Sequence, residues 1–183
     1  STLPSNTGNA TATHNCTNTV TNRSSADVRT NGSCNDNYVL ARTWTAVDSC
    51  NNSNSCVQMI TVQDTTRPAI VCPVNVTINC EASTLPANTG TATATDNCTN
   101  TVTNISSADV RTNGSCNDNY VLARTWTAVD SCNNSNSCVQ TITVQDTTRP
   151  AIVCPINVTI NCEASTLPAN TGTATATDNC TNT

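Results

Sequence analysis

The chain has 183 residues and a formal net charge of −5, with 13 Cys, no Phe and only 10% charged residues. All seven of its cationic residues are Arg. This excess of acidic groups gives no general electrostatic attraction to nucleic acid or to an anionic membrane surface, so we expect neither as a partner. No stretch reaches the apolar length of a membrane-spanning helix, so we expect no span within these residues.

The sequence is a tandem repeat. Residues 1–82 and 83–164 align without a gap and differ at six positions, and residues 165–183 repeat residues 83–101 without change. Near-identical copies are typical of an array that gains length or valency. His14 is the only His and is not repeated, so a Ser–His or Cys–His catalytic arrangement cannot recur in each copy. We therefore predict that the chain is not an enzyme.

Strand signals recur along each copy, separated by turns rich in Asn, Asp, Ser and Gly, whereas helix signals are missing. Pro73 interrupts the first expected strand, and the longest expected strand contains Trp126, which we expect to lie between two sheets. In chain order, the expected strands are residues 69–72 with 75–80, 89–96, 102–106, 108–112, 120–130 and 138–145. Six or seven short antiparallel strands at this spacing predict an all-β fold of β-sandwiches.

The expected module boundary does not coincide with the start of the visible copies. Residues 146–150, like residues 64–68, follow the last strand, lack apolar side chains and end in Pro. A boundary there makes residues 68–149 a complete module. Residues 1–67 then form a module without its opening strand, and residues 150–183 begin a third.

Each full copy contains six Cys whose spacings include no C-x₂-C knuckle. Because the chain has a single His, zinc or iron–sulfur ligation is a poor interpretation. A copy with one Trp, one Tyr and no Phe buries little apolar area, so it needs covalent staples. Three disulfides per copy, formed in an oxidising compartment, predict an extracellular chain that is secreted or displayed on a cell surface.

Three motifs stand out: DTTRPAIVCPVNVTINC, TGTATATDNC and RTWTAVDSCNNSNSCVQTITVQD. Together they resemble the hyalin-repeat (HYR-like) Ig-like modules, which occur in tandem in very large surface adhesins of Bacteroidetes, including the mobile adhesin of gliding cells. The resemblance implies tandem Ig-like sandwiches in an elongated array, secretion and a surface or filament role, and it identifies no ligand. Asn133 replaces the Gly that the family usually has after its D-x-C motif, so this turn could be built differently.

In a sandwich whose strands run alternately up and down, the strand ends that share a pole predict the disulfides. The expected pairs are Cys72–Cys138, Cys80–Cys116 and Cys98–Cys132, with Cys16–Cys50 in the first copy. The remaining cysteines would then need partners before residue 1, for Cys34 and Cys56, or after residue 183, for Cys154, Cys162 and Cys180. Fifteen pairings of six Cys are open in principle.

Acidic residues cluster at the ends of the expected modules. Asp96 and Asp130 flank the expected Cys98–Cys132 bond, and Asp64 lies in the linker that reaches the same pole. Three carboxylates with nearby Asn or main-chain oxygens could bind Ca²⁺, which would stiffen the joint. The other interpretation is that these Asp residues cap turns through Asx hydrogen bonds. His14 replaces the counterpart of Asp96, so an ion at the preceding joint would bind more weakly.

The linkers also contain candidate modification sites. Thr65 and Thr147 follow Asp in D-T-T sequences that resemble the D-T-x sites of O-glycosylation in secreted Bacteroidetes proteins. N-x-S/T sequons are frequent too, although such sequons arise by chance in a chain rich in Asn and Thr.

These features predict an extracellular structural repeat region, a stalk or filament of a bacterial cell-surface adhesin. It requires no cofactor, and Ca²⁺ is the only ion that we expect. The expected partners are neighbouring repeats and, through polar sheet edges, further copies that associate laterally into a fibre. The alternative is that each repeat binds a glycan or another surface ligand weakly and the array gains avidity.

Overall fold

The structure is a computed structural model that describes residues 2–15, 20, 22–98, 102 and 104–180. Strands make up 45% of the described residues and helices 7%. None of the helices in this part of the chain has the length and apolar character that a membrane span requires. The chain divides into two compact units. The first contains Ser1–Ile70, Thr93–Ser106 and Thr127–Ser137, and the second contains Val71–Ala92, Ser107–Trp126 and Cys138–Thr183. The expected module boundaries stay a prediction; below, the first, second and third copies are residues 1–67, 68–149 and 150–183, which recur with the same period of 82 residues.

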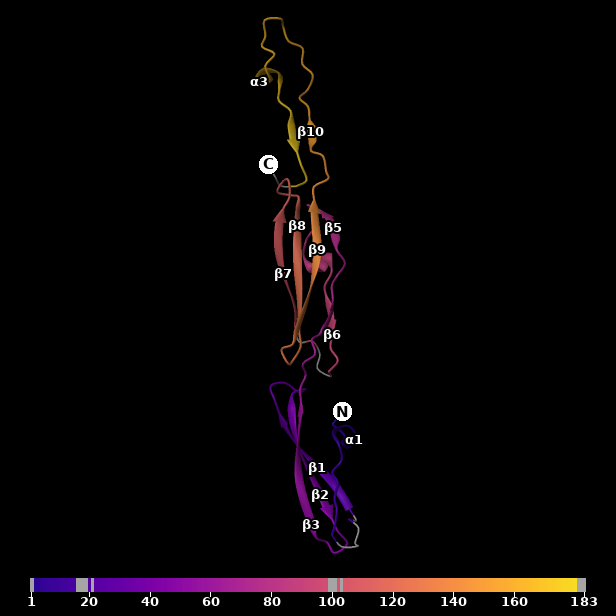
Figure 1. The fold of residues 1–183 in the computed structure, drawn as a ribbon. Helices are drawn as coiled ribbons and strands as arrows, with labels where there is room; N and C mark the ends of the chain where they lie inside the picture. The colour runs from indigo at the N-terminus through magenta and orange to yellow at the C-terminus, as the bar shows by residue number, and fades with distance from the viewer. Residues whose placement is uncertain (1, 16–19, 21, 99–101, 103, 181–183) are drawn as a thin grey trace. The chain divides into compact units, whose positions relative to one another are not determined.

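The first copy forms a three-stranded antiparallel sheet, preceded by the one-turn helix α1 (Pro4–Thr7). The strands β1 (Asn22–Asn31), β2 (Tyr38–Val47) and β3 (Ser53–Val62) lie side by side in that order (Figure 1). The central strand β2 pairs along its length with both neighbours, so that Trp44 lies opposite Ser25 on β1 and Cys56 on β3. β3 is consequently an edge strand of this sheet.

The second copy contains a four-stranded sheet in the order β5-β9-β8-β7 (Figure 1). Its strands are β5 (Val76–Asn79), β7 (Asn104–Asn113), β8 (Tyr120–Val129) and β9 (Ser135–Gln145). Two smaller sheets pair β4 (Ala69–Val71) with β6 (Thr93–Thr95), and β10 (Ala151–Val153) with β11 (Thr175–Thr177). The one-turn helices α2 (Pro86–Thr89) and α3 (Pro168–Thr171) precede β6 and β11.

The elements differ from expectation in three places. The interrupted first strand is two strands in different sheets, β4 and β5, because Pro73 has no N–H with which to continue a ladder. β5 also runs parallel to β9, with Val76 opposite Ile142, where antiparallel pairing was expected. α2 occupies residues expected to be loop and strand, and Pro86 at its first turn suits a helix start. Finally, β7 is one continuous strand where two were expected.

The core of the second copy is small. Leu122, Ile142 and Val144 are buried together, and further side chains pack against them, namely Val76, Ile78, Cys80 and Tyr120. Trp126 is 4% exposed, and its Nε1–H donates to Oε1 of Gln140 at 3.3 Å. Gln140, itself fully buried, donates from Nε2 to the carbonyl oxygens of Val74 (2.9 Å) and Thr89 (2.6 Å). Because an unpaired buried amide is costly, these bonds fix the position of both side chains.

Candidate functional site

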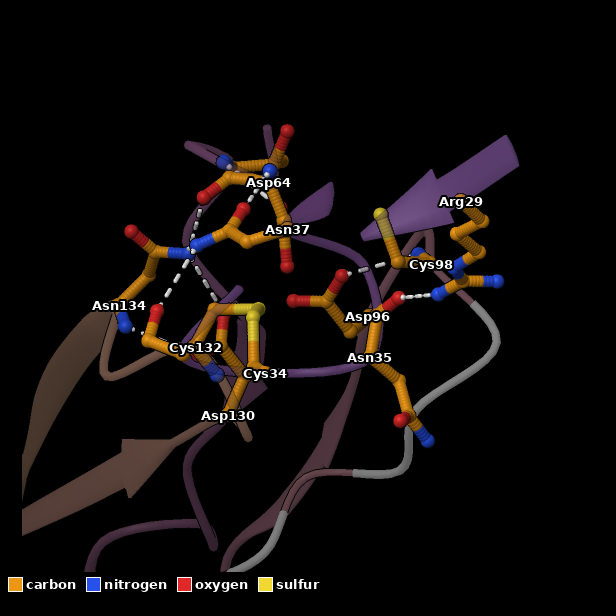
Figure 2. The surroundings of a disulfide bond; sticks show 12 residues. Arg29, Cys34, Asn35, Asn37, Asp64, Asp96, Cys98, Asp130, Cys132 and Asn134 are labelled. Atoms are coloured by element: carbon orange, nitrogen blue, oxygen red, sulfur yellow. Dashed lines mark hydrogen bonds between the residues drawn. A yellow bond between two sulfur atoms is a disulfide. The ribbon is translucent and has the colours of Figure 1, made fainter. Parts of the chain in front are cut away.

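A disulfide between Cys34 and Cys132 joins the two copies of the repeat. Cys34 lies in the loop between β1 and β2, and Cys132 lies in the turn between β8 and β9. Their Cα atoms are 5.2 Å apart, and the bond spans 98 residues, which exceeds the 82-residue period. Figure 2 shows side chains around this bond, and those that it labels belong to the first compact unit.

Asp130 shapes the turn that presents Cys132. Its Oδ1 accepts the backbone N–H groups of Cys132 and Asn134, both at 2.8 Å, and its Oδ2 accepts the side-chain amide of Asn134 at 2.9 Å. Asn133 has a φ of 67°, a left-handed conformation that Asn tolerates better than most residues other than Gly. Asn133 therefore adopts here a conformation that otherwise favours Gly.

The linker residue Asp64 is held by residues of both copies (Figure 2). Its carbonyl oxygen accepts the side-chain amide of Asn134 at 3.2 Å, and its N–H donates to Oδ1 of Asn37 at 2.7 Å. The Asp64 carboxylate in turn accepts the N–H of Thr66 at 3.1 Å. Asp64 is only 8% exposed, so the linker is a packed part of the joint between the copies.

Three carboxylates converge beside the disulfide. Ligand atoms of Asp36, Asp64 and Cys132 lie within 4.8 Å of one another, as do those of Asp64, Asp96 and Cys98. The structure thus brings Asp64 and Asp96 together as expected for a Ca²⁺ site, and Asp36, which the sequence reasoning missed, joins them. Asp130 instead uses both carboxylate oxygens in its turn, the Asx role that the sequence left open.

Carboxylate oxygens are hard ligands that suit Ca²⁺, whereas a disulfide sulfur is no thiolate ligand. Oδ2 of Asp96 is buried and has no hydrogen-bond partner among the described residues. Calcium at this cluster stays a prediction.

Cys98 is a half-buried thiol next to the cluster. Burial raises its pKa, and the negative charges of Asp64 and Asp36 raise it further. The thiolate is the nucleophilic form of Cys, so these surroundings make Cys98 a slow nucleophile.

No family model matches this chain, and no curated protein or solved structure matches it. The site must therefore be interpreted from its own geometry.

The other two disulfides lie in the second compact unit. Cys72 is bonded to Cys138, the expected pair, with Cα atoms 5.9 Å apart. Cys80 is bonded to Cys180 across 100 residues, with Cα atoms 6.0 Å apart. This second long-range bond joins the second copy to the third.

The bonds Cys80–Cys116 and Cys98–Cys132 expected from the sequence are thus replaced. The expectation assumed that disulfides form only within one copy. In the structure, Cys34 and Cys180 are each bonded to a cysteine of another copy in the same chain. The sequence already contained a hint of the Cys34–Cys132 bond. Cys34 precedes β2 and Asp64 follows β3, and because these two strands are antiparallel, both residues lie at the same pole of the sheet. The linker leaves the first copy toward the second from this pole. Cys16, the expected partner of Cys50, lies outside the described residues.

Six cysteines of the described residues are thiols: Cys50, Cys56, Cys98, Cys116, Cys154 and Cys162. All except Cys98 are exposed. Each is the counterpart, one period away, of a cysteine that is bonded elsewhere in the chain. The same bonding scheme would therefore give each of them a partner in a further copy.

The expected O-glycosylation sites are accessible. Thr65 and Thr147 are exposed in the segments that follow β3 and β9. Their modification stays a prediction.

Proposed function

We propose that the chain is an extracellular structural repeat region of tandem Ig-like sandwiches, a stalk or filament of a bacterial cell-surface adhesin without catalytic activity. The Cys34–Cys132 bond carries this proposal, because it ties one copy covalently to the next. Three disulfides also suggest an oxidising, extracellular environment.

The disulfides shorten the covalent path along the chain. From Cys34 this path crosses to Cys132, follows the chain to Cys138, crosses to Cys72, follows the chain to Cys80 and crosses to Cys180. At about 3.5 Å per residue, the whole stretch from Cys34 to Cys180 could extend to about 500 Å, but the bridged path only to about 65 Å. The oxidised chain therefore resists extension even when its sheets unfold, which is the property that a stalk needs.

Single-molecule pulling from the two termini tests this role. In the oxidised chain, unfolding should add no more than about 65 Å between Cys34 and Cys180, and a reductant should raise that limit to about 500 Å. The residues outside this stretch contribute equally in both states and serve as an internal reference. An oxidised chain that extends as far as the reduced chain would contradict the proposal.

A repeated Arg–Tyr pair supports the alternative, weak ligand binding with avidity. The guanidinium of Arg29 lies 3.9 Å from the ring centroid of Tyr38, and that of Arg111 lies 3.7 Å from the ring centroid of Tyr120. Each pair recurs one period away and is exposed on its Arg side. A sugar could stack on such a ring only where the guanidinium leaves it uncovered, so the stalk role is the better supported of the two. A glycan array probed with the chain and with Arg111→Ala would reveal binding.

A further inference from the structure

The two copies contain identical side chains in different surroundings. In the second copy Trp126 is 4% exposed, and Gln140, Ile142 and Val144 are at most 1% exposed. Their counterparts in the first copy are only half-buried, namely Trp44, Gln58, Ile60 and Val62. Because the residues are the same, the difference must come from what covers them.

In the second copy the cover is the segment of residues 68–80. Its strand β5 pairs in parallel with β9, from Val76 opposite Ile142 to Asn79 opposite Gln145. Just before this strand, Oδ1 of Asn75 accepts the N–H of Thr141 at 2.8 Å. The hydrogen bonds and the packing of Val76 and Ile78 on the core close this edge of the sheet.

Pro68 at the start of the same segment is fully buried. Its carbonyl oxygen accepts the side-chain amide of Asn136 at 3.0 Å, and β4, which follows it, pairs with β6. Farther along, Cys72 secures the segment to Cys138. Residues 68–80 thus bury the Pro68 side chain, complete an edge of the sheet and provide a covalent anchor.

In the first copy no segment covers the corresponding sheet edge, but the edge strand and a cavity beside it are already formed. β3, the counterpart of β9, is an edge strand, and residues 11–13, the counterpart of β6, lie outside the assigned strands. A cavity of about 430 Å³ is lined by residues that include Ala12, Trp44, Asn54 and Cys56. The amide of Gln58 still donates to the carbonyl oxygen of Thr7 at 2.8 Å, as Gln140 does to that of Thr89. Of the two hydrogen bonds that the Gln140 amide donates, the one that does not involve the covering segment is therefore already present at Gln58.

The matching segment is exposed at the other end of the chain. Residues 150–162 repeat residues 68–80 with one change, Ile156 for Val74. Pro150, Val158 and Ile160 are exposed, although their counterparts Pro68, Val76 and Ile78 are buried or half-buried. Cys154 and Cys56 are both exposed thiols, and their counterparts Cys72 and Cys138 are bonded to each other.

We propose that the open β3 edge and its cavity bind the segment of another copy of this repeat that has the sequence of residues 150–162, and that Cys154 of that copy bonds to Cys56. The segment adds a strand parallel to β3, in the manner of β-strand addition. Val158 lies opposite Ile60 and Ile160 opposite Val62, as β5 lies on β9. Pro150 fills the cavity. The docking surface does not depend on the stalk role, because peptide binding and mechanical extension are measured separately.

Formation of the covalent bond needs an oxidant, and a small-molecule disulfide such as oxidised glutathione serves. The Cys154 thiolate attacks one sulfur of the oxidant, whose S–S bond breaks and releases one small thiolate. The Cys56 thiolate then attacks Cys154 in the mixed disulfide and releases the second. Two protein thiols are oxidised to one disulfide, the oxidant is reduced to two thiols, and these take up the two protons.

The first test adds a synthetic peptide to the full chain in a glutathione redox buffer. The peptide has the sequence of residues 150–162 with Cys162→Ser, so that one thiol remains. We expect one peptide per chain, bonded to Cys56 in peptide mapping, and a blue shift of the Trp44 emission as that side chain becomes buried. A peptide that also carries Val158→Asp and Ile160→Asp keeps its thiol and should react at least about tenfold more slowly, which corresponds to about 1.4 kcal/mol.

Equal attachment of the peptide to the exposed thiols Cys50 and Cys116, or equal rates for the two peptides, would overturn the proposal. Cys56→Ser separates docking from the covalent bond. Hydrogen exchange in this variant should still show β3 protected at saturating peptide, and unchanged exchange would also overturn the proposal.

The second test supplies the segment on the same polypeptide. A chain that carries residues 68–82 directly before Ser1 should bury Trp44, bond the added first Cys to Cys56 and no longer take up the peptide. An extended chain that still bonds the free peptide at Cys56 as fast as the original chain would overturn the proposal.

Discussion

Arg124 donates two hydrogen bonds to the carboxylate of Asp109, from Nε to Oδ1 and from Nη2 to Oδ2, each 2.7 Å long. Arg124 is 3% exposed, and it also donates from Nη1 to Oγ1 of Thr89 and from Nη2 to the carbonyl oxygen of Thr84. The first copy repeats the bidentate pair between Arg42 and Asp27. A buried guanidinium needs such partners, so this network connects β7 and β8 with the segment around α2.

Asp109→Asn should lower the free energy of unfolding at pH 7 by about 1–2 kcal/mol, because it leaves the buried Arg124 with weaker, neutral acceptors. About a third of the Asp109 side chain is exposed, and solvent screening keeps the loss at this modest size. Urea unfolding measures the difference. Arg124→Lys keeps the charge but loses the bidentate geometry, and it should also destabilise the chain. Two variants that both unfold like the original chain would contradict this role.

The same ion pair should make stability depend on acid pH. The hydrogen bond from Arg124 lowers the pKa of Asp109. Burial raises this pKa, and the positive charge of Arg124 lowers it further, so the pKa lies below its usual value. A lowered folded-state pKa stabilises the chain above the unfolded Asp pKa of about 3.9, and this contribution is lost as the pH falls through the folded-state value. The stability difference between the original chain and Asp109→Asn should therefore shrink below about pH 4. A pH series of urea unfolding checks this, and a constant difference would contradict it.

Cys34→Ser should remove the bond between the first two copies. In the loop-entropy model, opening a loop of this length lowers the free energy of unfolding by about 4.7 kcal/mol. Cys132 should become reactive toward a thiol-specific reagent, which peptide mapping detects. Cys116→Ser is the matched control, because Cys116 is the counterpart of Cys34 but is an exposed thiol. Equal effects of the two substitutions would show that the bond contributes nothing.

Asn133→Ala should lower the free energy of unfolding by about 1 kcal/mol, because Ala is strained at positive φ. Asn133→Gly should be nearly neutral, since Gly adopts this conformation without a steric penalty. Thermal unfolding of both variants gives the comparison. Asn51, with a φ of 64°, is the same position in the first copy and should respond in the same order.

Cys98 should react with iodoacetamide more slowly than Cys116 at pH 8. Burial and the neighbouring carboxylates raise the pKa of Cys98, so less of it is thiolate at this pH. Raising the pH should narrow the difference as the thiolate population of Cys98 grows. Mass spectrometry of timed samples measures both rates in one chain. Faster alkylation of Cys98 than of Cys116 at pH 8 would be incompatible with this environment.

Much of the local structure follows from the sequence. Alternating apolar residues and Asn/Ser turns indicated β8 to within one residue and the end of β9, although β9 begins at Ser135, three residues before the expected start. The burial of Trp126 followed from its place in the longest expected strand. The pair Cys72–Cys138 followed from strand ends at one pole. At the joint, the pattern of Asp residues placed Asp64 and Asp96 together, although it missed Asp36.

The period, the strand-rich character and the need for disulfides could all be inferred from the sequence, because they depend on composition and short-range pattern. The bonds from Cys34 to Cys132 and from Cys80 to Cys180 became known only with the three-dimensional fold. Because the copies are nearly identical, every Cys has chemically equivalent candidate partners in its own copy and in the next. The spacing of the cysteines in the sequence therefore does not distinguish a disulfide within one copy from a disulfide between two copies. The fold determines which cysteines pair, because a disulfide forms only where the two Cα atoms lie within about 7 Å of each other.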